Sequence, residues 1–279
     1  MQTTDDFGTQ GTNPSNPKLL DYLAVEFVRS GWDIRRLHKL MVMSATYRQS
    51  SNVTREDLEK DPTNQFVERG PRFRLPAETI RDNALQASGL LIEKVGGDAV
   101  FPYAPDAIWD NTAQGVVVYP TNVPDDQMHR RSMYTFVKRN APVSNLVPFD
   151  MSDRRDAVTV RPLSNTPLQA LVLLNDTQFV EAYRKLAERA IKSSANPDEQ
   201  LTTLWRLAVR RHPDANELAA IRKFRDSELA RMQGKPDEVQ KLLAIGVAPA
   251  DPKVDPAQLA AMTVLTAGVM NTPDAYTLR

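Results

Sequence analysis

Apolar residues at helical spacing, bounded by helix start and stop signals, recur along most of this chain. In the stretch NPKLLDYLAVEFVRSG, Asn16 can cap a helix, Pro17 suits its first position and Gly31 follows its end. Asp33 can cap a second helix that begins only a few residues later. Because the connection is so short, the sequence predicts an αα-hairpin or an αα-corner here.

The C-terminal half repeats these signals. Five further stretches combine a capping residue, an apolar stripe and a following break: TPLQALVLLND, DTQFVEAYRKLAERAIK, DEQLTTLWRLAVRR, DANELAAIRKFRDSELARM and DPAQLAAMTVLTAGVMN. The sequence therefore predicts a mainly α fold, an irregular multi-helix bundle with little or no sheet.

Two stretches interrupt the helical pattern, residues 98–128 and 141–166, and both are rich in turn-forming residues. We interpret them as two long internal loops. The intervening HRRSMYTFVKRN has strand-like composition, but Met133, Phe136 and Val137 favour a helix. No clear linker is present, so we expect a single helical domain over residues 1–279, with a soft boundary near residue 165 as the alternative.

Charge and cysteine usage exclude several kinds of function. Lys plus Arg and Asp plus Glu both number 35, so no global field attracts nucleic acid, which is not expected as a partner. The chain has no Cys, which excludes disulfides, thiolate metal sites and haem attachment through C-x-x-C-H within it. No apolar run is long enough for a transmembrane helix, and the N-terminal residues do not follow the signal-peptide pattern. We assign no metal and no cofactor to this chain.

The densest charged stretch is RFRLPAETIRDNAL, which holds Arg74, Glu78, Arg81 and Asp82. Apolar residues recur from Ala77 to Leu91, and this spacing predicts a helix that ends before Gly96 and Gly97. The charged residues can form a carboxylate and Arg site, or an ion-pair network at the start of that helix. Both alternatives stay open.

A second candidate cluster lies in the loop stretch FDMSDRRD, which holds Asp150, Asp153 and Asp156 within seven residues. The spacing does not match a calcium-binding loop, and the neighbouring Arg154 and Arg155 would compete for the acids, so no metal is assigned. The catalytic candidates are therefore six residues from the two clusters: Arg74, Glu78, Arg81, Asp82, Asp150 and Asp153.

Basic and aromatic residues alternate in HRRSMYTFVKRN. Its four basic residues are candidates for anion or nucleic-acid binding: Arg130, Arg131, Lys138 and Arg139. A half-buried helix whose basic side chains pair with nearby acids is the competing interpretation.

Several stretches taken together, in this order and spacing, resemble one family: DDFGTQGTNPSNPKLLDYLAVEFVRSGWDIRRLHKLMVMSATYRQSS, GPRFRLPAETIRDNALQASGLL, HRRSMYTFVKRNAP, FDMSDRRD and SNTPLQALVLLNDTQFVEAYRKLAERA. The chain resembles the C-terminal domain of planctomycete cytochrome c-associated proteins, known as domain of unknown function 1553 (PSD family). The resemblance runs from about Asp5 to the C-terminus.

The resemblance implies a C-terminal portion of a larger, exported protein, and so an extracytoplasmic location in the periplasm or cell envelope. It implies partners within the same protein, an upstream cytochrome c-like domain that carries haem c and a second uncharacterised domain. It supplies no catalytic residues, because the family has no settled activity. The chain also departs from the family, with Val158 and Asn16 where relatives often have Cys and His.

We therefore expect an uncharacterised helical module that works in scaffolding or partner binding at the cell envelope. The first alternative is a hydrolase-type enzyme with a site built from the carboxylates and Arg residues named above. A weaker alternative is anion or nucleic-acid binding.

Overall fold

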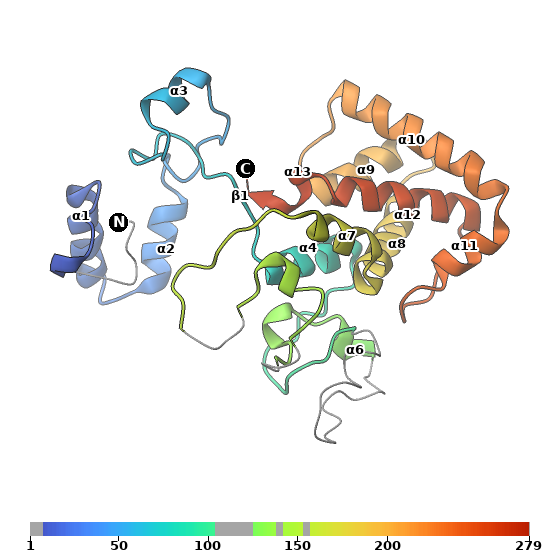
Figure 1. The fold of residues 1–279 in the computed structure, drawn as a ribbon, viewed down its shortest axis with the longest axis horizontal. Coiled ribbons are helices and arrows are strands. Elements are labelled where there is room, and N and C mark those ends of the chain that lie inside the picture. The colour runs from blue at the N-terminus through green and yellow to red at the C-terminus, as the bar shows by residue number, and fades with distance from the viewer. Residues whose placement is uncertain (1–7, 104–124, 138–141, 153–156, 279) are drawn as a thin grey trace. The chain divides into compact units, whose positions relative to one another are not determined.

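The computed structural model describes residues 8–103, 125–137, 142–152 and 157–278 (Figure 1). The described part is mainly helical, with a small two-stranded sheet, so the predicted mainly α fold is confirmed. The chain packs into two compact units. Unit 1 comprises Met1–Arg74, Ala157–Arg161 and Thr277–Arg279, and unit 2 comprises Leu75–Asp156 and Pro162–Tyr276. The number of domains, and a boundary near residue 165, stay predictions.

Unit 1 holds short elements at both ends of the sequence. They are the 3₁₀ turn η1 (Gly8–Gln10), the helices α1 (Pro17–Arg29), α2 (Ile34–Val42) and α3 (Arg55–Lys60), and the strands β1 (Phe73–Arg74) and β2 (Thr277–Leu278). The two strands pair antiparallel, with Phe73 opposite Leu278.

The predicted pair of closely connected helices is confirmed in α1 and α2, which we call the hairpin. The Asn16 side chain accepts a hydrogen bond from the Leu19 amide, and Asp33 caps α2 through the Arg36 amide. The ring of Phe27 meets that of Trp32 edge-on, with 5.1 Å between ring centroids. Neither helix contains a buried residue.

The helix α3 lies where the sequence pattern indicated only a polar connector. Thr54 and Asp57 form a reciprocal capping box at its start. The Thr-x-x-Asp spacing could therefore have indicated the start of a helix in the sequence, but no apolar stripe accompanied it.

Unit 2 holds the longer helices. They are α4 (Ala77–Ser88), α6 (Asp125–Met128), α7 (Pro167–Asn175), α8 (Thr177–Ile191), α9 (Pro197–Val209), α10 (Ala215–Gln233), α11 (Pro236–Leu243), α12 (Pro256–Met270) and α13 (Pro273–Tyr276), with the 3₁₀ turns η2 (Ser132–Tyr134) and η3 (Val147–Phe149).

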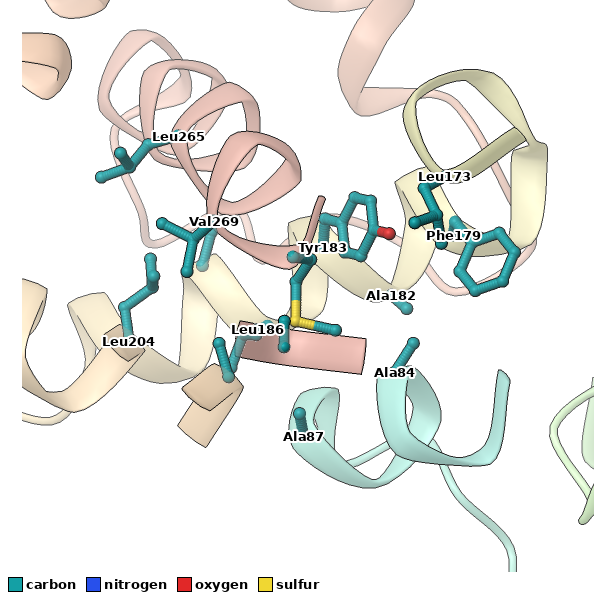
Figure 2. Close-up of a cluster of buried hydrophobic side chains, with 14 of the residues drawn as sticks. Ala84, Ala87, Leu173, Phe179, Ala182, Tyr183, Leu186, Leu204, Leu265 and Val269 are labelled. Atoms are coloured by element: carbon teal, nitrogen blue, oxygen red, sulfur yellow. The ribbon is translucent and has the colours of Figure 1, made fainter. Parts of the chain in front are cut away.

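The core of unit 2 is built around α8, which packs against α12, α4 and α9. Figure 2 shows Tyr183 and Leu186 of α8 among Val269 of α12, Leu204 of α9 and Ala84 of α4. All five are buried. Because Ala84 is small, α4 can pack closely against α8. This packing holds α4 in place, and the segments that follow it lie against it.

The helix predicted over HRRSMYTFVKRN is wrong for its described residues. Only the short turn η2 forms there, because the backbone hydrogen bonds run to other segments. The Ile92 amide donates to the His129 carbonyl at 3.1 Å, and Val100 exchanges hydrogen bonds with Tyr134 and Phe136, both at 2.8 Å. Long-range pairing has overridden the local helical pattern.

The helix at RFRLPAETIRDNAL also ends earlier than its apolar stripe predicted. Gly89 adopts the left-handed conformation, with φ of 80°, and closes α4 after Ser88. Leu91 consequently lies beyond the helix, in the segment that leads to Gly96 and Gly97. In the described part of the chain, no helix combines the length and the apolar character needed to cross a membrane.

Candidate functional site

A cavity of about 530 Å³ lies on unit 2 beside α4, the segment after it and η2. Its wall includes Asp82 of α4, Lys94, Arg131, Tyr134 of η2 and Arg210 at the end of α9. The structure thus brings two candidates from different sequence stretches, Asp82 and Arg131, to one cavity. Its volume lies in the range of small-molecule sites.

Asp82 is held in place by groups from the segment opposite α4. Its carboxylate accepts a hydrogen bond from the Ser132 amide at 2.7 Å. It lies 3.5 Å from Nε of Arg131 and 3.7 Å from Nη1 of Arg81. These contacts fix the orientation of the Asp82 carboxylate at the cavity.

Arg81 is fully buried one position before Asp82, and it joins three parts of unit 2. Its guanidinium donates to the carbonyls of Met128 at 2.6 Å and Arg130 at 2.8 Å, and to the side chain of Gln178 on α8. These partners are backbone and amide groups inside the protein. The observed role of Arg81 is therefore to fix the 128–132 segment on α4 and α8.

Arg130 is buried too, and it organises one wall of the cavity. It donates to the carbonyls of Lys94 at 2.9 Å, Gly96 at 2.6 Å and Asp98 at 3.3 Å. Its guanidinium carbon also lies 4.2 Å from the centre of the Tyr134 ring. Arg130 thus holds the 94–98 loop, while the exposed Arg131 beside it faces the cavity. The other two anion-binding candidates, Lys138 and Arg139, lie outside the described residues.

The remaining catalytic candidates lie elsewhere. Arg74 is buried in β1, and Glu78 is half-buried in the first turn of α4; neither is among the residues that line the cavity. Asp150 adopts a left-handed conformation and accepts hydrogen bonds from the amide of Ser164 at 2.7 Å and its hydroxyl at 2.9 Å. Asp153 lies outside the described residues. A catalytic role for these candidates stays a prediction.

A buried polar network that sequence reasoning did not assemble joins α8 to the turn after α11. Nε2 of His129 lies 3.0 Å from Oε2 of Glu181, and Oε1 accepts from the Ala248 amide at 2.6 Å. The Tyr103 hydroxyl donates to Glu181 at 3.1 Å and accepts from the Val247 amide at 2.7 Å. Burial alone would raise the pKa of Glu181, but these hydrogen bonds outweigh it and hold the pKa below its usual range.

The turn approaches Glu181 so closely that it requires glycine. Gly246 has φ of 89°, and a Cβ there would lie 2.6 Å from the Glu181 side chain. A signal for this network was present in the sequence, because Glu181, Arg184 and Glu188 recur at helical spacing on the buried face of α8.

No cluster of potential metal ligands occurs in the part of the chain that the structure describes. The cavity offers cationic, carboxylate, hydroxyl, amide and apolar groups, which together suit the binding of an organic molecule.

Comparison with known proteins places the chain in a family. No curated protein and no solved structure shows significant similarity to it. The model of one protein family, PSD1, described as a protein of unknown function (DUF1553), matches residues 1–225, which is most of the chain. The chain therefore belongs to the DUF1553 family PSD1.

Proposed function

We propose that this chain is a non-catalytic helical module that binds protein partners within a longer, exported, planctomycete cytochrome c-associated protein. The module acts outside the cytoplasm, and haem c is carried by an upstream domain. Membership of the DUF1553 family supports this proposal, together with the motifs that resemble such proteins. The observation that carries it is the exposed apolar surface of α1 and α2.

The helices α1 and α2 form a pair in which no side chain is buried. Leu20 and Val28 on α1 are 53% and 55% exposed, and Trp32 between the helices is 66% exposed. Single exposed apolar residues are common on soluble proteins, but apolar residues gathered on two adjacent helices mark an interaction site. We call the apolar residues of α1, α2 and Trp32 the hairpin surface.

A groove within unit 1 adjoins part of the hairpin surface, since Tyr22 of α1 and Leu40 of α2 both line it. The space beside α1 and α2 has a volume of about 540 Å³ and is lined by Tyr22, Leu40 and Met43 together with Glu26 and Arg36. A lining of apolar residues and charges of both signs suits an amphipathic helix, whose polar face can pair with those charges.

The occupant that we propose is the upstream part of the same protein, meaning the cytochrome c-like domain and the uncharacterised domain implied by the resemblance. A domain tethered before α1 would meet the hairpin surface at high effective concentration. Even a modest apolar contact would then suffice for stable docking.

Binding between this chain and the separately produced upstream part tests the proposal. We expect Leu20→Asp and Val28→Asp each to weaken that binding by about tenfold or more, since both place a charge in an apolar interface. The control is Leu58→Asp, which changes an exposed leucine of α3 in the same unit and should leave binding unchanged. No binding, or an equal loss with the control, would contradict the proposal. Loss of self-association with Leu20→Asp would show that a second copy is the occupant instead.

The complete reading frame tests the wider context. We expect a C-x-x-C-H haem-attachment motif upstream of this chain, behind a signal peptide. An open reading frame without either feature would refute the exported, cytochrome-associated context while leaving the binding role of the hairpin surface open to the first test.

A further inference from the structure

We propose that the cavity beside α4 binds a hydroxyl-bearing organic anion of about the size of a monosaccharide. This site lies in unit 2, and the argument for it does not depend on the hairpin surface of unit 1. It uses residues of four separate stretches, which the fold brings together at α4.

The charges at the cavity favour an anion. Lys94, Arg131 and Arg210 line it, as do the acids Asp82 and Glu93. Asp82 is already engaged by the Ser132 amide and by the neighbouring guanidinium groups. Among the described residues, by contrast, the ammonium group of Lys94 and the terminal nitrogens of Arg131 have no hydrogen-bonding partner, so they can donate to a ligand.

The loop that carries Lys94 and the guanidinium group of Arg131 are held in position before any ligand arrives. Arg130 donates hydrogen bonds to three carbonyls of the 94–98 loop, which carries Lys94. The Gly96 amide donates to the Tyr134 hydroxyl at 2.9 Å, which ties the same loop to η2. Nε of Arg131 donates to the Asp82 carboxylate at 3.5 Å, which orients the guanidinium and leaves its terminal nitrogens available. A site organised in this way loses little conformational entropy on binding.

The neutral residues of the cavity define the rest of the ligand. Thr79 and Gln86 supply a hydroxyl and an amide, which can pair with ligand hydroxyl groups. Leu91 and Val95 supply apolar surface for a carbon skeleton. An inorganic anion would leave most of the 530 Å³ and these groups unused. The combination therefore points to a sugar acid, a sugar sulfate or a sugar phosphate.

Calorimetric titration of the whole chain at constant ionic strength tests the proposal, with glucuronate, glucose monosulfate and glucose monophosphate as probes. The tightest of the three identifies the acidic group that the site prefers. Glucose and sodium sulfate serve as the neutral and the inorganic comparison. We expect at least one sugar anion to bind more tightly than both.

Variants locate the binding. Lys94→Gln and Arg131→Gln should each weaken the preferred sugar anion by about tenfold, the effect of losing a charge-assisted hydrogen bond. Lys94→Gln keeps the backbone carbonyl that Arg130 needs, so the variant retains the loop. Lys223→Gln changes an exposed lysine of α10 away from the cavity and should have no effect. The proposal is overturned if no sugar anion binds, if glucose or sulfate binds as tightly, or if Lys223→Gln weakens binding as much as Lys94→Gln.

Discussion

At the scale of single residues, the buried charges of unit 2 organise the backbone. Arg184 on α8 donates to the carbonyls of Ile245, at 3.1 Å, and Ala248, while Glu188 accepts from the Asp251 amide at 3.0 Å. Arg81 and Arg130 satisfy carbonyls in the same manner. Each of these side chains supplies hydrogen-bond partners that the backbone of an irregular segment would otherwise lack. The loops can therefore pack against the helical core without leaving buried backbone groups unsatisfied.

The contribution of Arg81 to the free energy of unfolding can be measured by substitution. Arg81→Leu should lower the free energy of unfolding by about 3 kcal/mol or more, because the buried Arg130 carbonyl and the Gln178 side-chain oxygen both lose their Arg81 donor. Arg206→Leu, at an exposed position of α9, should change it by less than about 0.5 kcal/mol. Urea unfolding of both variants measures the difference. Equal, small effects would show that the Arg81 contacts contribute little.

The pH dependence of stability should respond in opposite directions to the buried Glu181 and the half-buried Asp176. Because the pKa of Glu181 is lowered in the fold, its contribution is present above its ordinary value of 4.5 and is lost as the pH falls. Burial raises the pKa of Asp176 above its ordinary 3.8, so Asp176 destabilises the fold as the pH rises through that window. Glu181→Gln should therefore flatten the rise of stability between about pH 3 and pH 6, and Asp176→Asn should steepen it. Urea unfolding across this range measures both slopes, and the same change of slope in both variants would contradict the assignment.

The residue type alone does not tell which charged side chains bond to buried backbone groups and which are available to a ligand. Arg130 and Arg131 are adjacent and chemically identical. Arg130 is nevertheless buried and hydrogen-bonded to backbone carbonyls, whereas Arg131 faces a cavity. The difference depends on α4 and the 94–98 loop, which are distant in sequence. The sequence did indicate that Asp82 and Arg131 were candidates, but it could not place them together.

At the scale of elements, the helices were predictable because their signals are local. Asn16, Asp33 and Asp214 cap the helices that follow them, and Pro167 and Pro256 occupy first-turn positions. The segment around η2 was not predictable in this way. Its apolar spacing is helical, but its amides and carbonyls bond to residues more than thirty positions away.

The helix α7 shows how one element divides its residues between core and surface. Leu173 is buried in the core of unit 2, whereas Leu171 is 56% exposed. We expect Leu173→Ala to lower the free energy of unfolding by about 2–5 kcal/mol, through loss of burial and creation of a cavity. Leu171→Ala should change it by less than about 0.5 kcal/mol. Thermal or urea unfolding compares the two, and similar losses would mean that α7 is buried on both sides.

At the scale of the whole molecule, the two units differ in how they are stabilised. Unit 2 has a continuous core in which α8, α9, α12 and α4 share buried residues. The hairpin of unit 1 has none, and helices of this length are marginal without tertiary packing. This contrast is the physical basis for assigning partner binding to the hairpin surface.

The central claim, that the hairpin surface binds the upstream part of the protein, is tested most directly by amide hydrogen exchange. In the chain alone, we predict fast exchange in α1 and α2 and slow exchange in α8 and α12. Adding the separately produced upstream part should slow exchange in α1 and α2 and leave α8 and α12 unchanged. If exchange in α1 and α2 stays unchanged at a saturating concentration of the upstream part, the claim is contradicted.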